Sequence, residues 1–229
     1  LLSQFQPDAL LCVRPSSQDP DWGGPGAILN VGMNDASFVE LSDKLGAEAA
    51  ASIYQRFVQT YAIHVARLDP DVFEEIDAQG QQGLSDALMA YEDEAEEPFP
   101  QSPAVQLAEV LRSMARAWEG TSARLLRQAK GAPVDAGLGL VVQEMALGLG
   151  HGECGSGVLQ LVNSDTGLPQ ITGRYLSQSQ GREALAAGAK SLFLERDERG
   201  PSLQDLAPQA FEDKLQNFKY FSFIKKTPI

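Results

Sequence analysis

The sequence predicts an α+β fold in which a block of helices is flanked by short β-strands. Apolar residues recur every three or four positions over about residues 36–131, as in helices that bury one face. Over about residues 138–177 this period gives way to alternation of apolar and other residues, with only short turns between the runs. That pattern predicts an antiparallel β-meander. We therefore expect three parts: a β-rich segment at 1–35, a helical part at 36–131, and the meander with a carboxyl-terminal helix at 132–229.

The first predicted strand is the apolar run Leu10-Leu11-Cys12-Val13, and residues 27–31 predict a second. Arg14 follows the first strand directly, where its guanidinium would suit a carboxylate or a phosphate held near the strand end. The chain also contains 31 acidic residues. From composition alone, an ordinary ion pair with one of these acids is the favoured interpretation of Arg14.

Capping residues divide the helical part into separate helices. Asn34-Asp35 predicts the start of the first helix, and an apolar stripe over residues 45–68 predicts the longest one. Ser85 and Ser102-Pro103 predict the starts of later helices. After the meander we expect a helix at 181–190, a short extended segment at 191–194 and a terminal helix at 203–218.

Composition excludes several classes of function. A net charge of −13 repels nucleic acid and anionic lipid, and no run approaches the ~18 apolar residues of a membrane span. Two distant cysteines and the lack of a recognisable targeting signal favour the cytoplasm. The acidic run from Glu92 to Glu97 resembles a divalent-metal site in composition, but a solvated helix end explains it better.

The glycine-rich stretch from Gly148 to Gly157 allows two interpretations. Glycine lets backbone N–H groups approach an anion closely, and Ser156 adds a hydroxyl, so the stretch suits a phosphate. A surface connection has the same composition. For the stretch taken alone, the surface connection is the favoured interpretation.

Four segments taken together resemble the N-terminal, ATP-grasp-like nucleotide-binding domain of pyruvate phosphate dikinase and PEP synthase-like enzymes. Their order and spacing cover nearly the whole chain. They are Val13-Arg14 to Asn30-Val31-Gly32-Met33-Asn34-Asp35; Arg56 to Tyr61; Phe99-Pro100-Gln101-Ser102-Pro103 with the helix to Trp118; and Val142-Gln143-Glu144-Met145 through Gly155-Ser156-Gly157 to Gln180-Gly181.

The resemblance implies an ATP-grasp-like domain with a helical insertion, with ATP and magnesium as cofactors. It implies that Arg14 contacts the ATP phosphates and that Gln143, Glu144 and Met145 lie along the adenine pocket. It also implies that Gly155, Ser156 and Gly157 form a loop over the phosphates, and it places Gln180 in the same nucleotide set. We assign no catalytic or metal-binding residue within the chain.

The sequence also departs from the family pattern. Pro15 to Gln18 replaces a segment with a second arginine, Val162 replaces another arginine, and Arg174 and Arg182 stand where the family has acids. The family's phosphate-binding Gly-Lys-Gly segment would precede Leu1, and its metal-binding glutamate and glutamine would follow Ile229. We therefore expect a domain incomplete at both ends, without the phosphohistidine and pyruvate-binding domains of the family.

Three functions remain open on this basis. The chain is an ATP-binding part of a dikinase-like phosphotransferase that passes phosphate toward a phosphohistidine carrier, a non-catalytic nucleotide-binding or regulatory module, or a structural remnant. The lost charges predict at best weak ATP binding and no catalysis by this chain alone, because phosphoryl transfer relies on cations and metal that hold the negative charge of the phosphates.

Overall fold

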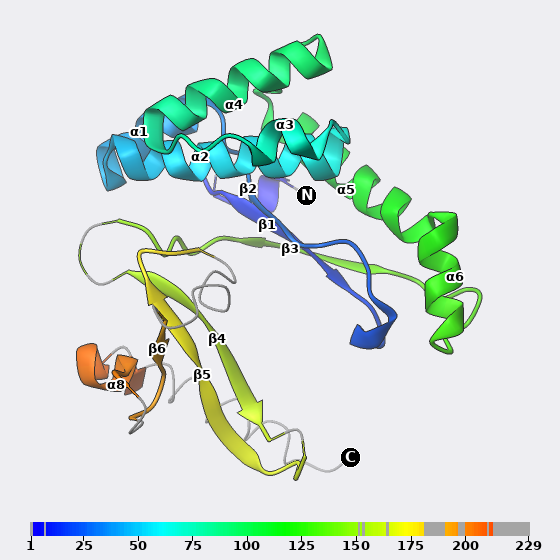
Figure 1. Cartoon of the computed structure of the whole chain (residues 1–229), viewed down its shortest axis with the longest axis vertical. Helices are drawn as coiled ribbons and strands as arrows, with labels where there is room; N and C mark the ends of the chain where they lie inside the picture. Colours follow the sequence, from blue (N-terminus) through cyan, green and yellow to red (C-terminus); the bar gives the residue numbers. More distant parts are fainter. Residues whose placement is uncertain are drawn as a thin grey trace. The chain divides into compact units, whose positions relative to one another are not determined.

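The computed structural model describes residues 2–6, 8–150, 152, 154–163, 165–180, 191–196, 200–209 and 211–212 (Figure 1). It confirms the α+β class, with a set of helices and two small antiparallel sheets. The chain forms two compact units, Leu1–Ala146 and Leu147–Ile229. The predicted division at residues 35 and 131 remains a prediction about subdomains. Within the described ranges, no helix is long and apolar enough to cross a membrane.

The sheet of the first unit has β1 (Leu11–Ser16) at its centre. β2 (Ile28–Val31) and β3 (Gly139–Glu144) pair with β1 on either side, both antiparallel. The predicted meander is therefore wrong at its start, because β3 pairs with a strand more than 120 residues earlier. Alternation marks a strand but does not identify its partner, and a segment of ten residues, 145–154, separates β3 from the next strand.

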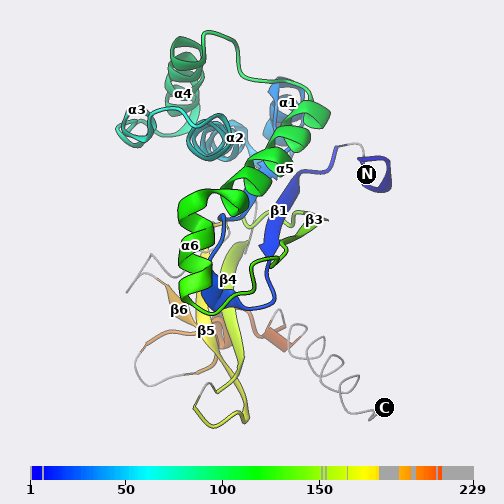
Figure 2. The same ribbon diagram turned by 90° about the vertical axis from the view of Figure 1, so that its right-hand side faces the viewer.

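Helices fill the chain between β2 and β3, as predicted. They are α1 (Asp35–Leu45), α2 (Ala47–Tyr61) with a π-helical extension (Ala62–Ala66), α3 (Pro70–Glu74), α4 (Gly80–Ala95), α5 (Pro103–Glu119) and α6 (Thr121–Ala129). Figures 1 and 2 show α2 and α4 side by side, and both α2 and α5 contact the sheet.

Aromatic rings form the centre of the helical core. Phe99, which precedes α5, packs edge-on against Tyr54, Phe57 and Tyr61 of α2 and Tyr91 of α4, with ring centroids 5.1–5.9 Å apart. All five rings are buried. Edge-to-face contacts of this kind add specific geometry to the burial of apolar area, so one loop residue joins two helices.

The helix starts were predicted with mixed success. Asn34 caps α1, accepting a hydrogen bond from the Ser37 N–H while its own N–H donates to Ser37 Oγ, and Ser102 precedes α5 as predicted. The start at Ser85 is wrong, since α4 begins at Gly80. Gln55 of α2 donates to the carbonyl of Ala78 at 2.9 Å. This tertiary contact fixes the chain just before α4, and no local signal encodes it.

The second unit contains the meander. β4 (Gly155–Val162), β5 (Pro169–Ser177) and β6 (Leu192–Phe193) form an antiparallel sheet in that order, followed by the short helix α8 (Leu203–Leu206). The extended segment predicted at 191–194 is confirmed by β6. The helix predicted at 181–190 and the end of the one predicted at 203–218 lie outside the described residues.

Candidate functional site

Two of the residues expected near the nucleotide lie on one face of the first sheet. Cys12 pairs with Gln143 and Arg14 pairs with Val141, so Arg14 and Gln143 occupy diagonal positions on the same face. Side chains at such positions lie roughly 7–8 Å apart. Both residues are exposed. The structure thus brings together two residues that are distant in sequence, a cation and an amide, on an accessible surface.

The next two residues of the predicted set, Glu144 and Met145, have structural partners. Glu144 Oε1 accepts a hydrogen bond from the backbone N–H of Gln6 at 2.9 Å. The backbone N–H of Met145 donates to Leu10 O at 2.9 Å, and Met145 Sδ accepts from Asn30 N at 3.0 Å. These contacts fasten the end of β3 to both neighbouring segments, and they hold the strand that carries Gln143 in place.

The predicted phosphate loop at Gly155, Ser156 and Gly157 is wrong in its conformation. These residues are the first three of β4 and pair with Ser177, Leu176 and Tyr175 of β5. A Cβ on Gly155 would come within 2.4 Å of Leu176 O, and one on Gly157 within 2.6 Å of Arg174 O. The glycines are therefore required for close strand packing, a reason that composition does not distinguish from anion binding.

The hydroxyl of Ser156 is engaged within the unit. Ser156 Oγ lies 2.7 Å from Ser179 Oγ, and Ser179 Oγ donates to Leu176 O at 2.7 Å. A hydroxyl has a single proton. Because the Ser179 hydroxyl donates its proton to Leu176 O, Ser156 is the donor in the hydroxyl pair. The Ser156 proton is therefore not directed at a ligand in this arrangement. Gln180, the next residue of the predicted set, is buried beside Ser179.

The connection before β4 is held by the residues that follow β5. Gln178 accepts a hydrogen bond from Gly150 N at 3.0 Å through Oε1 and donates to Gly152 O at 3.0 Å through Nε2. The backbone N–H of Ser179 donates to Gly148 O, also at 3.0 Å. The glycine-rich connection at 148–152 is thus attached along its length, and sequence reasoning missed Gln178 as its anchor.

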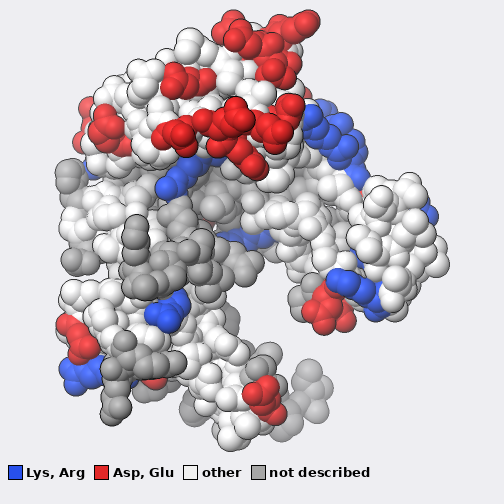
Figure 3. All heavy atoms as spheres, viewed as in Figure 1, with Lys and Arg blue, Asp and Glu red and all other residues white. Residues whose placement is uncertain are grey.

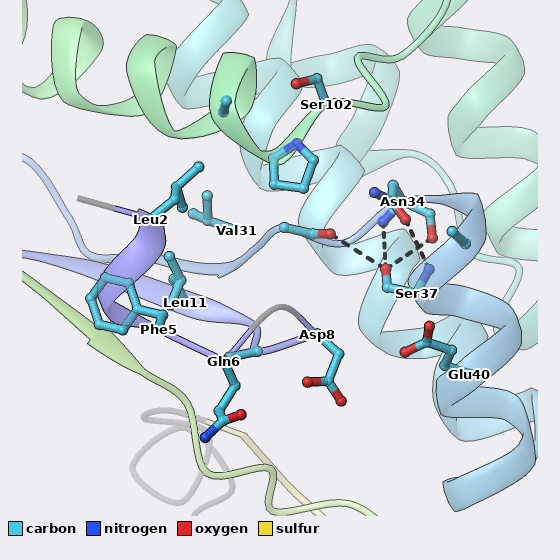
Figure 4. A pocket seen from close by; sticks show the side chains of 15 residues that line it. Leu2, Phe5, Gln6, Asp8, Leu11, Val31, Asn34, Ser37, Glu40 and Ser102 are labelled. Atoms are coloured by element: carbon cyan, nitrogen blue, oxygen red, sulfur yellow. Dashed lines mark hydrogen bonds between the residues drawn. The ribbon is translucent and has the colours of Figure 1, made fainter.

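A cavity of about 440 Å³ lies elsewhere in the first unit (Figure 4). The amino-terminal residues Leu2 and Phe5 form one side, and the first turns of α1 and α5 contribute Ser37 and Ser102. Asp8 and Glu40 add carboxylates. None of the residues expected to bind a nucleotide lines this cavity.

Two glutamines join two of the sequence segments that carry the resemblance, and one of them also contacts α2. Gln101 accepts from Asp35 N at 2.9 Å through Oε1 and donates to the Tyr54 hydroxyl at 3.0 Å. Gln106, which is fully buried, accepts from Gly32 N at 2.8 Å and donates to Met33 O and Pro100 O. These side chains connect the β2–α1 turn to α5. Because they are neither charged nor nucleophilic, a sequence search for such residues does not find them.

Acidic side chains gather over the helices of the first unit, as the red surface in Figure 3 shows. Within the part of the chain that the structure describes, no three carboxylate, imidazole or thiol groups are arranged to hold a metal ion. We therefore derive no step through a metal ion held by these residues.

Comparison with known proteins identifies the relatives of the chain. No family model matches it. It is 29% identical to pyruvate, phosphate dikinase from Rhizobium meliloti over 89% of this chain, and 30% identical to that from Clostridium symbiosum over 77%. It is 25% identical to pyruvate, phosphate dikinase 1 from Zea mays over 94%.

The chain spans about a quarter of the length of these relatives, from 22% to 25%. The matches cover 77% to 94% of this chain, so each extends into both units. By sequence, the chain is therefore a homologue of one region of the pyruvate, phosphate dikinases.

Proposed function

We propose that the chain is an ATP-binding domain of a dikinase-like phosphotransferase, which takes phosphate from ATP toward a phosphohistidine carrier. ATP is then its ligand, magnesium arrives with the nucleotide, and the histidine-bearing and pyruvate-binding domains are its partners in a longer enzyme. Nucleic acid and membranes are not partners in this proposal, and the cytoplasm is its compartment.

The observation that carries the proposal is the pairing of β1 with β3. It sets Arg14 and Gln143 on one accessible face of a sheet that the dikinase homology covers. Among the described strands, β3 is an edge strand, so one side of its backbone has no strand partner. An edge offers N–H and C=O groups for a planar base, and a guanidinium suits phosphate oxygens.

A second function has specific support. Val162 stands where the family resemblance expects an arginine, Arg174 stands where it expects an acid, and the Ser156 hydroxyl is engaged with Ser179. Val162 lacks the positive charge of the expected arginine, Arg174 reverses the charge of the expected acid, and the Ser156 hydroxyl is not directed at a ligand. These observations favour a non-catalytic nucleotide-binding or regulatory module on the same scaffold.

Calorimetric titration of the chain with Mg-ATP tests nucleotide binding, which both proposed functions require. We expect weak binding, with a Kd well above ~1 μM. Arg14→Gln should weaken it at least about tenfold through the loss of a charge-assisted contact. Arg124→Gln is the matched control, because Arg124 is an exposed arginine on α6. Undetectable heat with the unaltered chain would contradict nucleotide binding. A Kd of ~1 μM or below would contradict the expectation that binding is weak.

A further inference from the structure

The second unit has a hollow of about 300 Å³ beside its sheet, distant in sequence from the glycine-rich connection. Its described lining comes from β5 (Ile171, Thr172, Gly173, Arg174) and from the chain at and after β6 (Phe193, Leu194, Glu195, Arg196). The glycine-rich connection contacts Gln178 and Ser179, beyond the other end of β5. The hollow is therefore a separate feature of the unit.

The hollow arises because β6 leaves β5 after two residue pairs. Arg174 pairs with Phe193 and Tyr175 with Leu192, and no further pair joins these strands in the described residues. Phe193 N–H instead donates to Pro201 O at 3.0 Å, and Gln204 N–H donates to Leu194 O at 3.1 Å. These bonds hold the departing chain in its own position, so the gap beside β5 is built by the fold.

Arg174 is oriented within this hollow. Its guanidinium lies 3.9 Å from the centroid of the Phe193 ring, and Nη1 donates to Ser191 O at 3.3 Å. The residue is half-buried, and it forms no ion pair with a described carboxylate. A cation without a carboxylate is notable in a chain of net charge −13, where acids outnumber bases by 31 to 18. Stacking on a ring fixes the plane of a guanidinium and leaves its remaining donors available.

A second guanidinium stands at the rim. Arg196 Nε donates to Asp205 Oδ1 at 2.6 Å, and Asp205 Oδ2 in turn accepts from Ser202 Oγ at 2.6 Å. The Arg196 side chain is 74% exposed, and its terminal nitrogens bond no described residue. Glu195 is the one described carboxylate in the lining, and it is exposed. Two guanidiniums therefore line one hollow, the first with no carboxylate partner among the described residues and the second held by Asp205, which is outside the lining.

We propose that this hollow binds a small organic oxyanion, a carboxylate or a phosphate monoester, through Arg174 with Arg196 at the rim. Guanidinium groups bind both anions through paired charge-assisted hydrogen bonds. Ile171 and buried Leu194 supply apolar surface for the body of the ligand. The site uses none of the residues proposed for ATP, so it stands independently of the proposed function.

Arginine side-chain NMR tests the site in the full chain, with inorganic phosphate and butyrate as the two probes at constant ionic strength. We expect the Nε–H signal of Arg174 to shift with saturation for at least one probe, and the tighter probe identifies the source of the oxyanion. Arg174→Gln should weaken binding at least about tenfold, while Arg124→Gln, on α6 of the other unit, should leave it unchanged. Phe193→Leu keeps an apolar side chain but removes the ring, and it should weaken binding several-fold while the backbone spectrum stays folded.

The same titrations can overturn the proposal. A shift that grows linearly with both probes, without saturation, would show that Arg174 is only a solvated surface charge. Saturation that survives Arg174→Gln would place the anion elsewhere. If the Arg174→Gln protein is unfolded, Arg174→Lys takes its place in the titrations. Lysine keeps the charge but loses the planar pair of donors, so binding should still weaken. Equal affinity of Arg174→Lys and the unaltered chain would also overturn the proposal.

Discussion

At the scale of single residues, we expect replacement of Gln106 to lower the free energy of unfolding strongly for a side chain of its size. Its amide makes three hydrogen bonds, to Gly32 N, Met33 O and Pro100 O, at a fully buried position. Gln106→Leu keeps the approximate volume but leaves these backbone groups without partners. We expect the free energy of unfolding to fall by about 3 kcal/mol or more. Urea unfolding measures this.

The matched control for that substitution is Gln128→Leu, at an exposed position on α6. It makes the same chemical change where water can replace the amide, so the free energy of unfolding should change by less than about 0.5 kcal/mol. A similar effect of both substitutions would contradict the role assigned to Gln106.

The buried tyrosines predict a loss of stability at high pH. Burial raises the pKa of Tyr91 to about 12, with Glu97 and Glu109 adding to the effect. Burial likewise raises the pKa of Tyr61 and Tyr54 well above the usual value. An unfolded tyrosine has a pKa of about 10. The stabilisation is therefore complete below about pH 10 and is lost as the pH rises toward the folded-state pKa.

Unfolding in urea at about pH 8 and about pH 11 checks this sign. The free energy of unfolding should be lower at the higher pH, and Tyr91→Phe should reduce the difference because phenylalanine does not ionise. The Tyr91 hydroxyl has no hydrogen bond to a described residue, so Tyr91→Phe should change the free energy of unfolding little near neutral pH. Equal pH dependence in the two proteins would show that Tyr91 ionises freely in the folded chain.

At the scale of elements, β5 depends on a glycine at its centre. A Cβ on Gly173 would lie 1.9 Å from Val158 O of β4 and 2.6 Å from Leu194 Cδ1. Gly173→Ala should therefore force β4 and β5 apart, lower stability by at least about 2 kcal/mol and speed amide exchange in both strands. Gly200→Ala, where the nearest atom is an ordinary 3.5 Å away, is the control in the same unit. Unchanged exchange in Gly173→Ala would contradict this packing.

At the scale of the whole molecule, we expect this chain alone not to transfer phosphate from ATP to an acceptor. Phosphoryl transfer depends on cations placed around the β- and γ-phosphates. Of the cations that the family resemblance implies within this chain, Arg14 is retained, whereas Gln18 and Val162 are neutral. An assay that follows ATP with pyruvate and phosphate present should show no turnover. Turnover abolished by Arg14→Gln would overturn this expectation, and turnover that survives it would point to a contaminant.

Several features could be predicted from the sequence because their causes are local. Helical periodicity located the helical block, Asn34 marked the start of α1 through its own side chain, and alternation located β4 and β5. The family resemblance was also readable, since it rests on the order of short segments along the chain.

Tertiary structure alone decided which strands pair and which polar groups are free. β3 joins β1 because the fold returns it there after more than 100 residues, and this pairing sets Arg14 beside Gln143. The Ser156 proton is engaged because Ser179 is folded against it, and Arg174 faces a hollow because β6 bends away from β5. Local patterns report the conformation of a segment. They carry no information about the partner that completes its hydrogen bonds, and that partner determines what each predicted site residue can bind.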